Sequence, residues 1–327
     1  MKPLLLATCA LLLASCTSKS NKIPVRLGTG MQTQQIPFAL AQSLGFFSDE
    51  GLAVSIETLS TNGKTAQALV GGSVDVAAIA YSQIIHLAAE GLSLRSFFFS
   101  VRRNSTVIVT TSAKIRRAED LKGVKIGIPS TGAAVLPFLN YYLLQHGVQP
   151  SEAATIPIGI AASAVAAIEA GRVDAAAVAG GDHLRLQRRI PALRILVDGS
   201  TPEGLRELFA SDAYVTGALS ARREWLDQNP DTARRLARAL ARTLQWIATH
   251  KPEEIREKLP ASFRSDDPAL DLEIIRWGLD GYTPDGRMPA GAPEAMKRFL
   301  DTVYDNVRNA KIDLNATWTN DFLPIPQ

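Results

Sequence analysis

Ten residues in loops after short apolar segments have groups that can hydrogen-bond a small polar molecule. They supply hydroxyls, amides, one carboxylate and backbone N–H groups, and they are Gln32, Thr61, Asn62, Tyr81, Ser82, Ser130, Thr131, Gly132, Ala133 and Asp182. In open α/β sheets, ligands bind beyond the carboxyl ends of the strands, where loops and helix N-termini converge. We therefore predict that these residues line a binding site.

The segment Ser130 to Ala134 follows a strand predicted at 125–128 and precedes a predicted helix. Hydroxyls and free N–H groups at the N-terminus of a helix favour an anion. The segment is interpreted as an anion cradle, although a serine or threonine here is also an ordinary helix cap. Residues 60–63 repeat the same chemistry.

Two residues of the set have alternative roles. Asp182 could meet an ammonium group of a ligand, or it could form hydrogen bonds at a hinge. Tyr81 could cover one face of a ligand, or it could pack as a half-buried tyrosine. The sequence leaves both alternatives open.

Other classes of site lack their residue patterns. Gly28-Thr29-Gly30 has neither the third glycine of a dinucleotide fingerprint nor the ending of a P-loop, and the four histidines lack the spacing of a zinc site. The 35 Lys and Arg and the 32 Asp and Glu are scattered along the chain, so the sequence shows no cluster of basic residues of the kind that binds nucleic acid. We expect no catalysis, cofactor, metal or nucleic acid.

The first fifteen residues predict an export signal. Lys2 precedes an apolar run from Leu4 to Ala14 that is too short to span a bilayer. The run ends in Leu13-Ala14-Ser15-Cys16, which resembles the lipobox of bacterial lipoproteins; the alternative is an ordinary signal peptide. We expect cleavage of residues 1–15 with Cys9, lipidation of Cys16 and a flexible tether over 16–22, which would hold an exported protein at a membrane face.

The remaining chain is long enough for about two domains and contains a repeat. Residues 68–80 align with 167–179 without gaps, at an offset of 99, and seven of thirteen positions are identical. Each copy predicts a helix ending at Gly72 or Gly171, then a turn with Asp75 or Asp174, then a strand buried on both faces. The two aspartates are interpreted as turn residues.

The elements around the repeat predict two α/β lobes with mostly parallel sheets. Strand-like runs at 25–27 and 54–59 flank a helical pattern at 37–47, which is a β-α-β unit. Two further strand-like segments, within 94–111 and 212–219, suggest that the second lobe is inserted into the first through a two-strand hinge. We predict lobe 1 at 23–108 and 216–327, and lobe 2 at 109–215.

The chain resembles the solute-binding proteins of nitrate, sulfonate, taurine and thiamine-precursor import systems. The resemblance lies in four stretches in the family's order: residues 37–54 with Gly45-Phe46-Phe47, residues 68–77, residues 120–127 and Asn229-Pro230. The chain departs from the family at Gly180-Gly181-Asp182-His183, where relatives often carry an aromatic residue and a proline.

The resemblance implies a two-lobed periplasmic-binding-protein fold of type II. It also implies a monomeric protein that closes on a small anionic or zwitterionic solute, such as a sulfonate, taurine or nitrate, and delivers it to the membrane subunits of an ABC permease. The alternatives are binding of a pyrimidine precursor of thiamine, signalling to a membrane receptor, and an enzyme on the same scaffold. The enzyme is disfavoured because the family's synthases use a cysteine-rich motif, whereas the mature chain has only Cys16.

Overall fold

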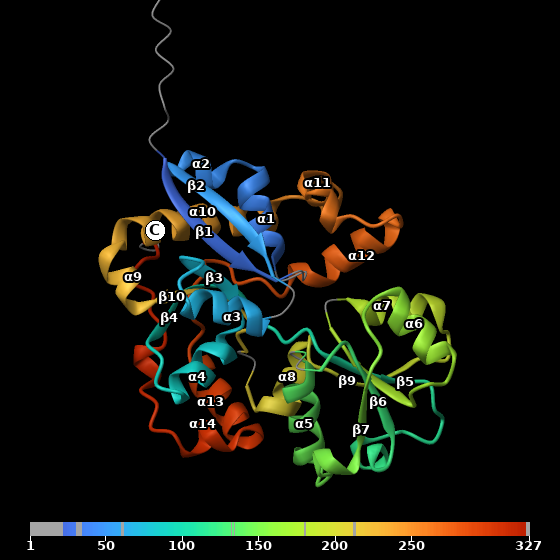
Figure 1. Ribbon diagram of the computed structural model, residues 1–327. Helices are drawn as coiled ribbons and strands as arrows, with labels where there is room; N and C mark the ends of the chain where they lie inside the picture. Colours follow the sequence, from blue (N-terminus) through green and yellow to red (C-terminus); the bar gives the residue numbers. More distant parts are fainter. Residues whose placement is uncertain are drawn as a thin grey trace, which may run out of the picture.

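The computed structural model describes residues 22–30, 35–59, 62–131, 133, 135–179, 181–211 and 214–324 of the 327-residue chain. These residues form two five-stranded sheets, each flanked by helices (Figure 1). The part built on the first sheet is called lobe 1, and the part built on the second is lobe 2. The predicted two-lobed α/β architecture is confirmed.

Both sheets have the same strand arrangement. Lobe 1 has the order β2-β1-β3-β10-β4, with β1 (Ile23–Thr29), β2 (Leu52–Thr58), β3 (Val76–Ile79), β4 (Leu94–Val101) and β10 (Gly217–Arg222). Lobe 2 has the order β7-β6-β8-β5-β9, with β5 (Val107–Thr110), β6 (Lys125–Ile128), β7 (Ala154–Pro157), β8 (Ala175–Val178) and β9 (Arg194–Asp198). In each sheet only the fourth strand of this order, β10 or β5, is antiparallel to its neighbours.

Helices cover both sheets. Lobe 1 carries α1 (Ile36–Ser43), α2 (Phe46–Asp49), α3 (Asn62–Val70), α4 (Tyr81–Ala89), α9 (Arg223–Gln228), α10 (Pro230–Thr249), α11 (Pro252–Lys258), α12 (Pro268–Leu279), α13 (Ala292–Val303) and α14 (Asp305–Asn309). Lobe 2 carries α5 (Val135–Gln145), α6 (Ala162–Glu169), α7 (Asp182–Arg189) and α8 (Pro202–Phe209). Within the described residues, no helix combines the length and the apolar content needed to cross a bilayer.

The sequence repeat is visible in the pairing of the strands, because equivalent residues of the two copies pair in the same register. Leu27 pairs with Val76 in lobe 1, and Ile126 pairs with Ala175 in lobe 2, so both pairs keep the offset of 99 residues. All four residues of β3 and of β8 are buried, because helices cover both faces of a mostly parallel sheet. The two lobes are therefore copies of one β-α-β plan.

The repeated aspartates connect neighbouring strands. Asp75 Oδ2 accepts a hydrogen bond from the backbone N–H of Arg26 at 2.8 Å, and Asp174 Oδ2 accepts one from the N–H of Lys125 at 3.1 Å. The backbone N–H of each aspartate donates back to the carbonyl of the same partner, at 2.9 and 2.8 Å. Their interpretation as structural turn residues is confirmed.

The helix predicted at 37–47 is broken. Gly45 adopts φ +76°, a left-handed conformation that most residues avoid, and it separates α1 from α2. The longer C-terminal helix α10 buries Leu236, Leu240, Leu244 and Ile247 on one face. Its arginines are not simply solvated, because Arg238 and Arg242 pair with Glu50 and Asp49 beside α2.

The chain crosses between the lobes twice, and the two crossings are hydrogen-bonded to each other. The N–H of Tyr214 donates to the carbonyl of Arg102 at 3.4 Å, and the hydroxyl of Thr216 donates to the carbonyl of Arg103 at 2.8 Å. Val107 already belongs to lobe 2, because β5 pairs with β8 and β9. The first crossing thus lies at 102–106, slightly before the predicted boundary at 108.

Candidate functional site

The predicted residues that the structure describes lie in the loops and helix starts after parallel strands. Asn62 follows β2, Tyr81 and Ser82 follow β3, Asp182 follows β8, and Ser130, Thr131 and Ala133 follow β6. Gln32, Thr61, Gly132 and the predicted lipidation residue Cys16 lie outside the described residues. In Figure 1 the arrowheads of β1 and β2 point toward the lobe that carries α6 and α7.

The loop after β6 differs from the expected helix cap. Ser130 and Thr131 are exposed, and the N–H of Ala133 donates to the carbonyl of Ser130 at 3.1 Å, which closes a turn. α5 begins only at Val135, so neither hydroxyl residue is at the N-cap position. The expected cap is absent at Ser130 and Thr131 because a hydrogen-bonded turn takes the place of the first helical turn. Both hydroxyls are accessible to a ligand.

Tyr81 lies in the core of lobe 1. Its side chain is fully buried, its ring meets Phe99 edge to face at 6.0 Å, and its hydroxyl is 2.6 Å from Thr317 Oγ1. Burial raises the pKa of the Tyr81 hydroxyl above its usual value. A residue enclosed in this way cannot cover a ligand, so the expectation that it faces the site is corrected in favour of the packing alternative.

Asp182 is the first residue of α7 and is partly buried. Burial raises the pKa of its carboxyl, while the backbone N–H of Ala161 and the charge of Arg185 act in the opposite direction. The backbone N–H of Ala161 donates to Asp182 Oδ2 at 3.5 Å. Ala161 has a φ of +50°, which is a strained value for alanine. The carboxylate thus lies between two loops at the strand ends of lobe 2, where it can reach a cation.

Three polar residues near these loops were not predicted. Gln35 Oε1, His183 Nδ1 and Arg185 Nε are buried, and none has a hydrogen-bond partner among the described residues. Buried polar atoms without a partner are rare and require an explanation such as a water or a ligand. His183 directly follows Asp182, and Gln35 lies three residues after Gln32 in the same predicted loop, so position in the chain was the signal that could have found them.

A helix of lobe 1 contacts the strand-end loop of lobe 2. The ring of Trp277 in α12 meets the ring of His183 in α7 at 5.2 Å, and its Nε1 donates to Ser200 Oγ at 3.1 Å. Gly181 is so close to α12 that a Cβ atom there would lie 3.0 Å from Ile274 Cγ1. Burial lowers the pKa of His183, which favours its neutral form. The two lobes therefore meet beside the candidate site.

The described part of the site offers hydrogen-bond donors and acceptors from both lobes. Asn62 and the amide of Gln35 come from lobe 1, whereas Ser130, Thr131, Asp182 and Arg185 come from lobe 2. Among the described residues, no group of three or more His, Cys, Asp or Glu side chains could hold a metal ion. This arrangement suits reversible binding of a small polar or charged molecule.

Two solved structures share the fold over most of the chain. One is a protein of Bordetella bronchiseptica RB50, which is 29% identical, has a TM-score of 0.82, and matches 92% of this chain and 96% of its own length. The other is the periplasmic aliphatic sulphonate binding protein SsuA of Escherichia coli, at 19% identity and a TM-score of 0.71, with coverage of 92% and 99%.

The sequence is also similar to that of a curated protein. The nitrate/nitrite binding protein NrtA of Nostoc sp. (strain PCC 7120) is 24% identical over 312 residues, which are 88% of this chain and 68% of that protein. Residues 32–255 match the family model described as NMT1/THI5 like. These residues run from just after β1 into α11, include both crossings and make up more than half of the chain, so the protein belongs to the NMT1/THI5-like family.

Proposed function

We propose that this chain is the substrate-binding protein of an ABC importer. It captures a small anionic or zwitterionic solute between its two lobes and delivers the solute unchanged to the permease. The observation that carries the proposal is the position of the polar loops. They follow the parallel strands of both lobes, and one of them, at the start of α7 in lobe 2, contacts α12 of lobe 1.

The chemistry of these loops supports an oxyanion as the ligand. The hydroxyls of Ser130 and Thr131 and the guanidinium of Arg185 can donate hydrogen bonds to a sulfonate or nitrate oxygen. Asp182 can accept from an ammonium group, which would favour a zwitterion such as taurine. Two similar proteins bind ligands of this class, because SsuA binds aliphatic sulphonates and NrtA binds nitrate or nitrite.

Lobe closure supplies the selectivity in this proposal. A ligand that touches both lobes stabilises the arrangement in which both sets of contacts exist, and it shifts a pre-existing balance between open and closed forms. The hydrogen-bonded crossings at 102–106 and 214–216 provide the hinge. The protein acts as a monomer, because one chain supplies both walls.

The proposed location is the cell envelope. The signal over 1–15 directs export, and lipidation of Cys16 anchors the mature protein near its permease. The first strand begins at Ile23, so a tether over 16–22 would connect the anchor directly to lobe 1. The anchor would raise the local concentration of the binding protein at the membrane.

A ligand panel tests the proposed function. The purified protein is heated with methanesulfonate, taurine, nitrate or a hydroxymethylpyrimidine, and each stabilising compound is then titrated by calorimetry. A ligand at about 100 times its dissociation constant should add about 2.7 kcal/mol to the free energy of unfolding. Chromatography of the recovered ligand should show it unchanged. Stabilisation by the pyrimidine alone would support the thiamine-precursor alternative, and ligand turnover would contradict the proposal.

A further inference from the structure

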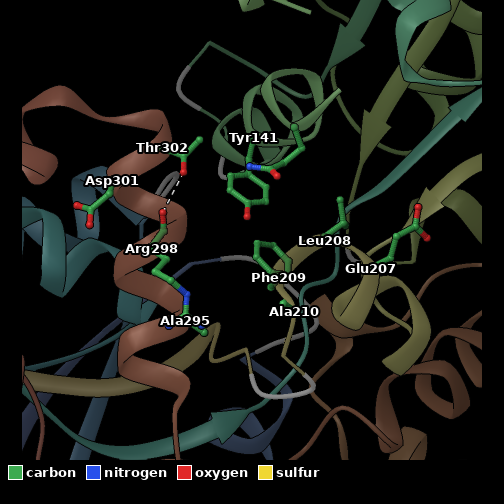
Figure 2. A pocket seen from close by; sticks show the side chains of 10 residues that line it. Tyr141, Glu207, Leu208, Phe209, Ala210, Ala295, Arg298, Asp301 and Thr302 are labelled. Carbon is green, nitrogen blue, oxygen red and sulfur yellow. Dashed lines mark hydrogen bonds between the residues drawn. The ribbon is translucent and has the colours of Figure 1, made fainter. Parts of the chain in front are cut away.

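A second space lies away from the strand-end loops, in a groove between the lobes. It has a volume of about 500 Å³ and is lined by the second half of α5, the end of α8 and one face of α13 (Figure 2). α5 begins at Val135 beside the strand ends and is roughly 16 Å long at 1.5 Å per residue. Tyr141 and Gln145 lie in its later turns, so the groove is displaced toward the opposite edge of the sheet. We call it the α5–α13 groove.

The floor of the α5–α13 groove consists of the rings of Tyr141 and Phe209, which belong to an aromatic cluster from both lobes. Tyr141 and Phe209 of lobe 2 are stacked, with ring centroids 5.3 Å apart. Phe299 of lobe 1 meets both rings edge to face, at 5.1 and 5.5 Å. Tyr214, in the second crossing, packs against Phe209 at 4.7 Å. Because the walls belong to different lobes and the floor touches the hinge, any change in lobe orientation changes this space.

Two hydrogen-bond donors open into the α5–α13 groove without a partner among the described residues. The side chain of Tyr141 is about nine-tenths buried, and Figure 2 shows its hydroxyl directed into the space between α13 and α8. Arg298, across the groove on α13, is exposed, and the charge of its guanidinium acts on the Tyr141 hydroxyl. The neighbouring Lys297 and Asp301 pair with each other at 2.6 Å, which leaves Arg298 as the available cation.

These groups define the chemical class of a ligand. A guanidinium binds a planar oxyanion through two parallel hydrogen bonds, and a phenol hydroxyl can donate one more. Stacked rings favour an apolar or aromatic body. Glu207 on the opposite wall would repel additional negative charge. A volume of about 500 Å³ is within the range of small-molecule sites, which is roughly 300–1,000 Å³.

We propose that the α5–α13 groove is a second binding site, separate from the strand-end loops, for a small organic monoanion with an aromatic or apolar body. Arg298 binds the oxyanion, Tyr141 donates a hydrogen bond to it, and Phe209 packs against the body. This site goes beyond the transport ligand, because it uses none of the residues of the strand-end loops.

The test uses 4-fluorobenzoate as the probe and fluorine NMR of the probe with the purified protein. Wild-type protein should bind it with a dissociation constant below a few millimolar. Arg298→Gln should weaken binding about tenfold or more, and Tyr141→Phe should weaken it several-fold while keeping the ring. Arg308→Gln is the matched control, because it removes another exposed cation of lobe 1 that lies outside the groove.

A variant of the strand-end loop separates this proposal from the proposed function. Thr131→Trp should leave binding of 4-fluorobenzoate unchanged. If Thr131→Trp abolishes probe binding and Arg298→Gln does not, the probe occupies the strand-end site and the second site is disproved, although the transport function stands. If wild-type protein did not bind 4-fluorobenzoate at a probe concentration of several millimolar, the inference would also be overturned, whatever the ligand panel shows.

Discussion

The guanidinium of Arg188, in lobe 2, lies 2.7 Å from the carboxylate of Glu273, in lobe 1. Its Nη1 also lies 3.2 Å from Asp267 Oδ2 of lobe 1. The next residue, Arg189, pairs instead with Glu169 inside lobe 2 at 3.0 Å. Of these two adjacent arginines, Arg188 therefore connects the lobes, and Arg189 does not.

Arg188→Ala should move the lobes apart in solution and weaken ligand binding. Exposed ion pairs contribute about 0.2–1 kcal/mol each, so losing two should lower the affinity roughly two- to thirtyfold. Small-angle scattering of the unliganded protein and calorimetry of the liganded one measure the two effects. Arg189→Ala is the matched control and should change neither quantity. Equal effects of the two substitutions would show that the interlobe pairs have no special role.

Thr131→Trp should reduce affinity for the transported ligand by at least tenfold. The bulky ring would occupy the accessible loop after β6, where small residues leave room for a ligand. The free energy of unfolding should change by less than about 0.5 kcal/mol, because Thr131 is exposed. Calorimetry and urea unfolding measure these quantities. Thr249→Trp, at an exposed position at the end of α10, should leave the affinity unchanged. Full affinity in Thr131→Trp would remove this loop from the site.

Asp182 should make the unliganded protein less stable as the pH rises. Burial raises the pKa of its carboxyl above the ordinary value of 3.8, so the folded protein retains a proton that the unfolded chain has already lost. The free energy of unfolding therefore falls as the pH rises from about this value through the folded-state pKa, and it is constant with respect to this group above that pKa. Asp182→Asn should remove this decline, which urea unfolding at several pH values would detect.

Asp75→Asn provides a control of opposite sign for that measurement. Burial alone would raise the pKa of Asp75, but hydrogen bonds from the side chain and backbone of Arg26 outweigh it and lower the pKa. Asp75 therefore adds stability that is lost as the pH falls through its folded-state pKa. If both asparagine variants changed the pH dependence in the same direction, the assignment for Asp182 would be wrong.

The two repeated aspartates should differ in their contributions to stability. Asp75→Ala and Asp174→Ala each leave a strand N–H without its side-chain acceptor; both hydrogen bonds are exposed, so the cost should be below the about 1–3 kcal/mol of a buried group. Asp75 also pairs with the guanidinium of Arg26 at 2.6 Å, whereas Asp174 forms no ion pair with any of the described residues. Asp75→Ala should therefore destabilise more, as measured by urea unfolding. A larger loss for Asp174→Ala would contradict this account.

Local sequence determined much of the fold. The glycines that end the repeated helices, the aspartates in the following turns and the small apolar strands occur at the same spacing in both halves. Each of these signals acts over a few residues, because backbone conformation and burial of a short strand depend on near neighbours. The repeat, the mostly parallel sheets and the loops that carry the polar residues were therefore predictable.

Only the tertiary structure decided which of those polar residues are accessible to a ligand. Tyr81 is buried in the core, and its hydroxyl is hydrogen-bonded to Thr317, which lies 236 residues away in the chain. Trp277 and Arg298 come from C-terminal helices whose local patterns resemble any surface helix. Trp277 lies near His183, and Arg298 lies across the groove from Tyr141, because of how the two lobes pack. The spacing of residues along the chain does not predict that packing.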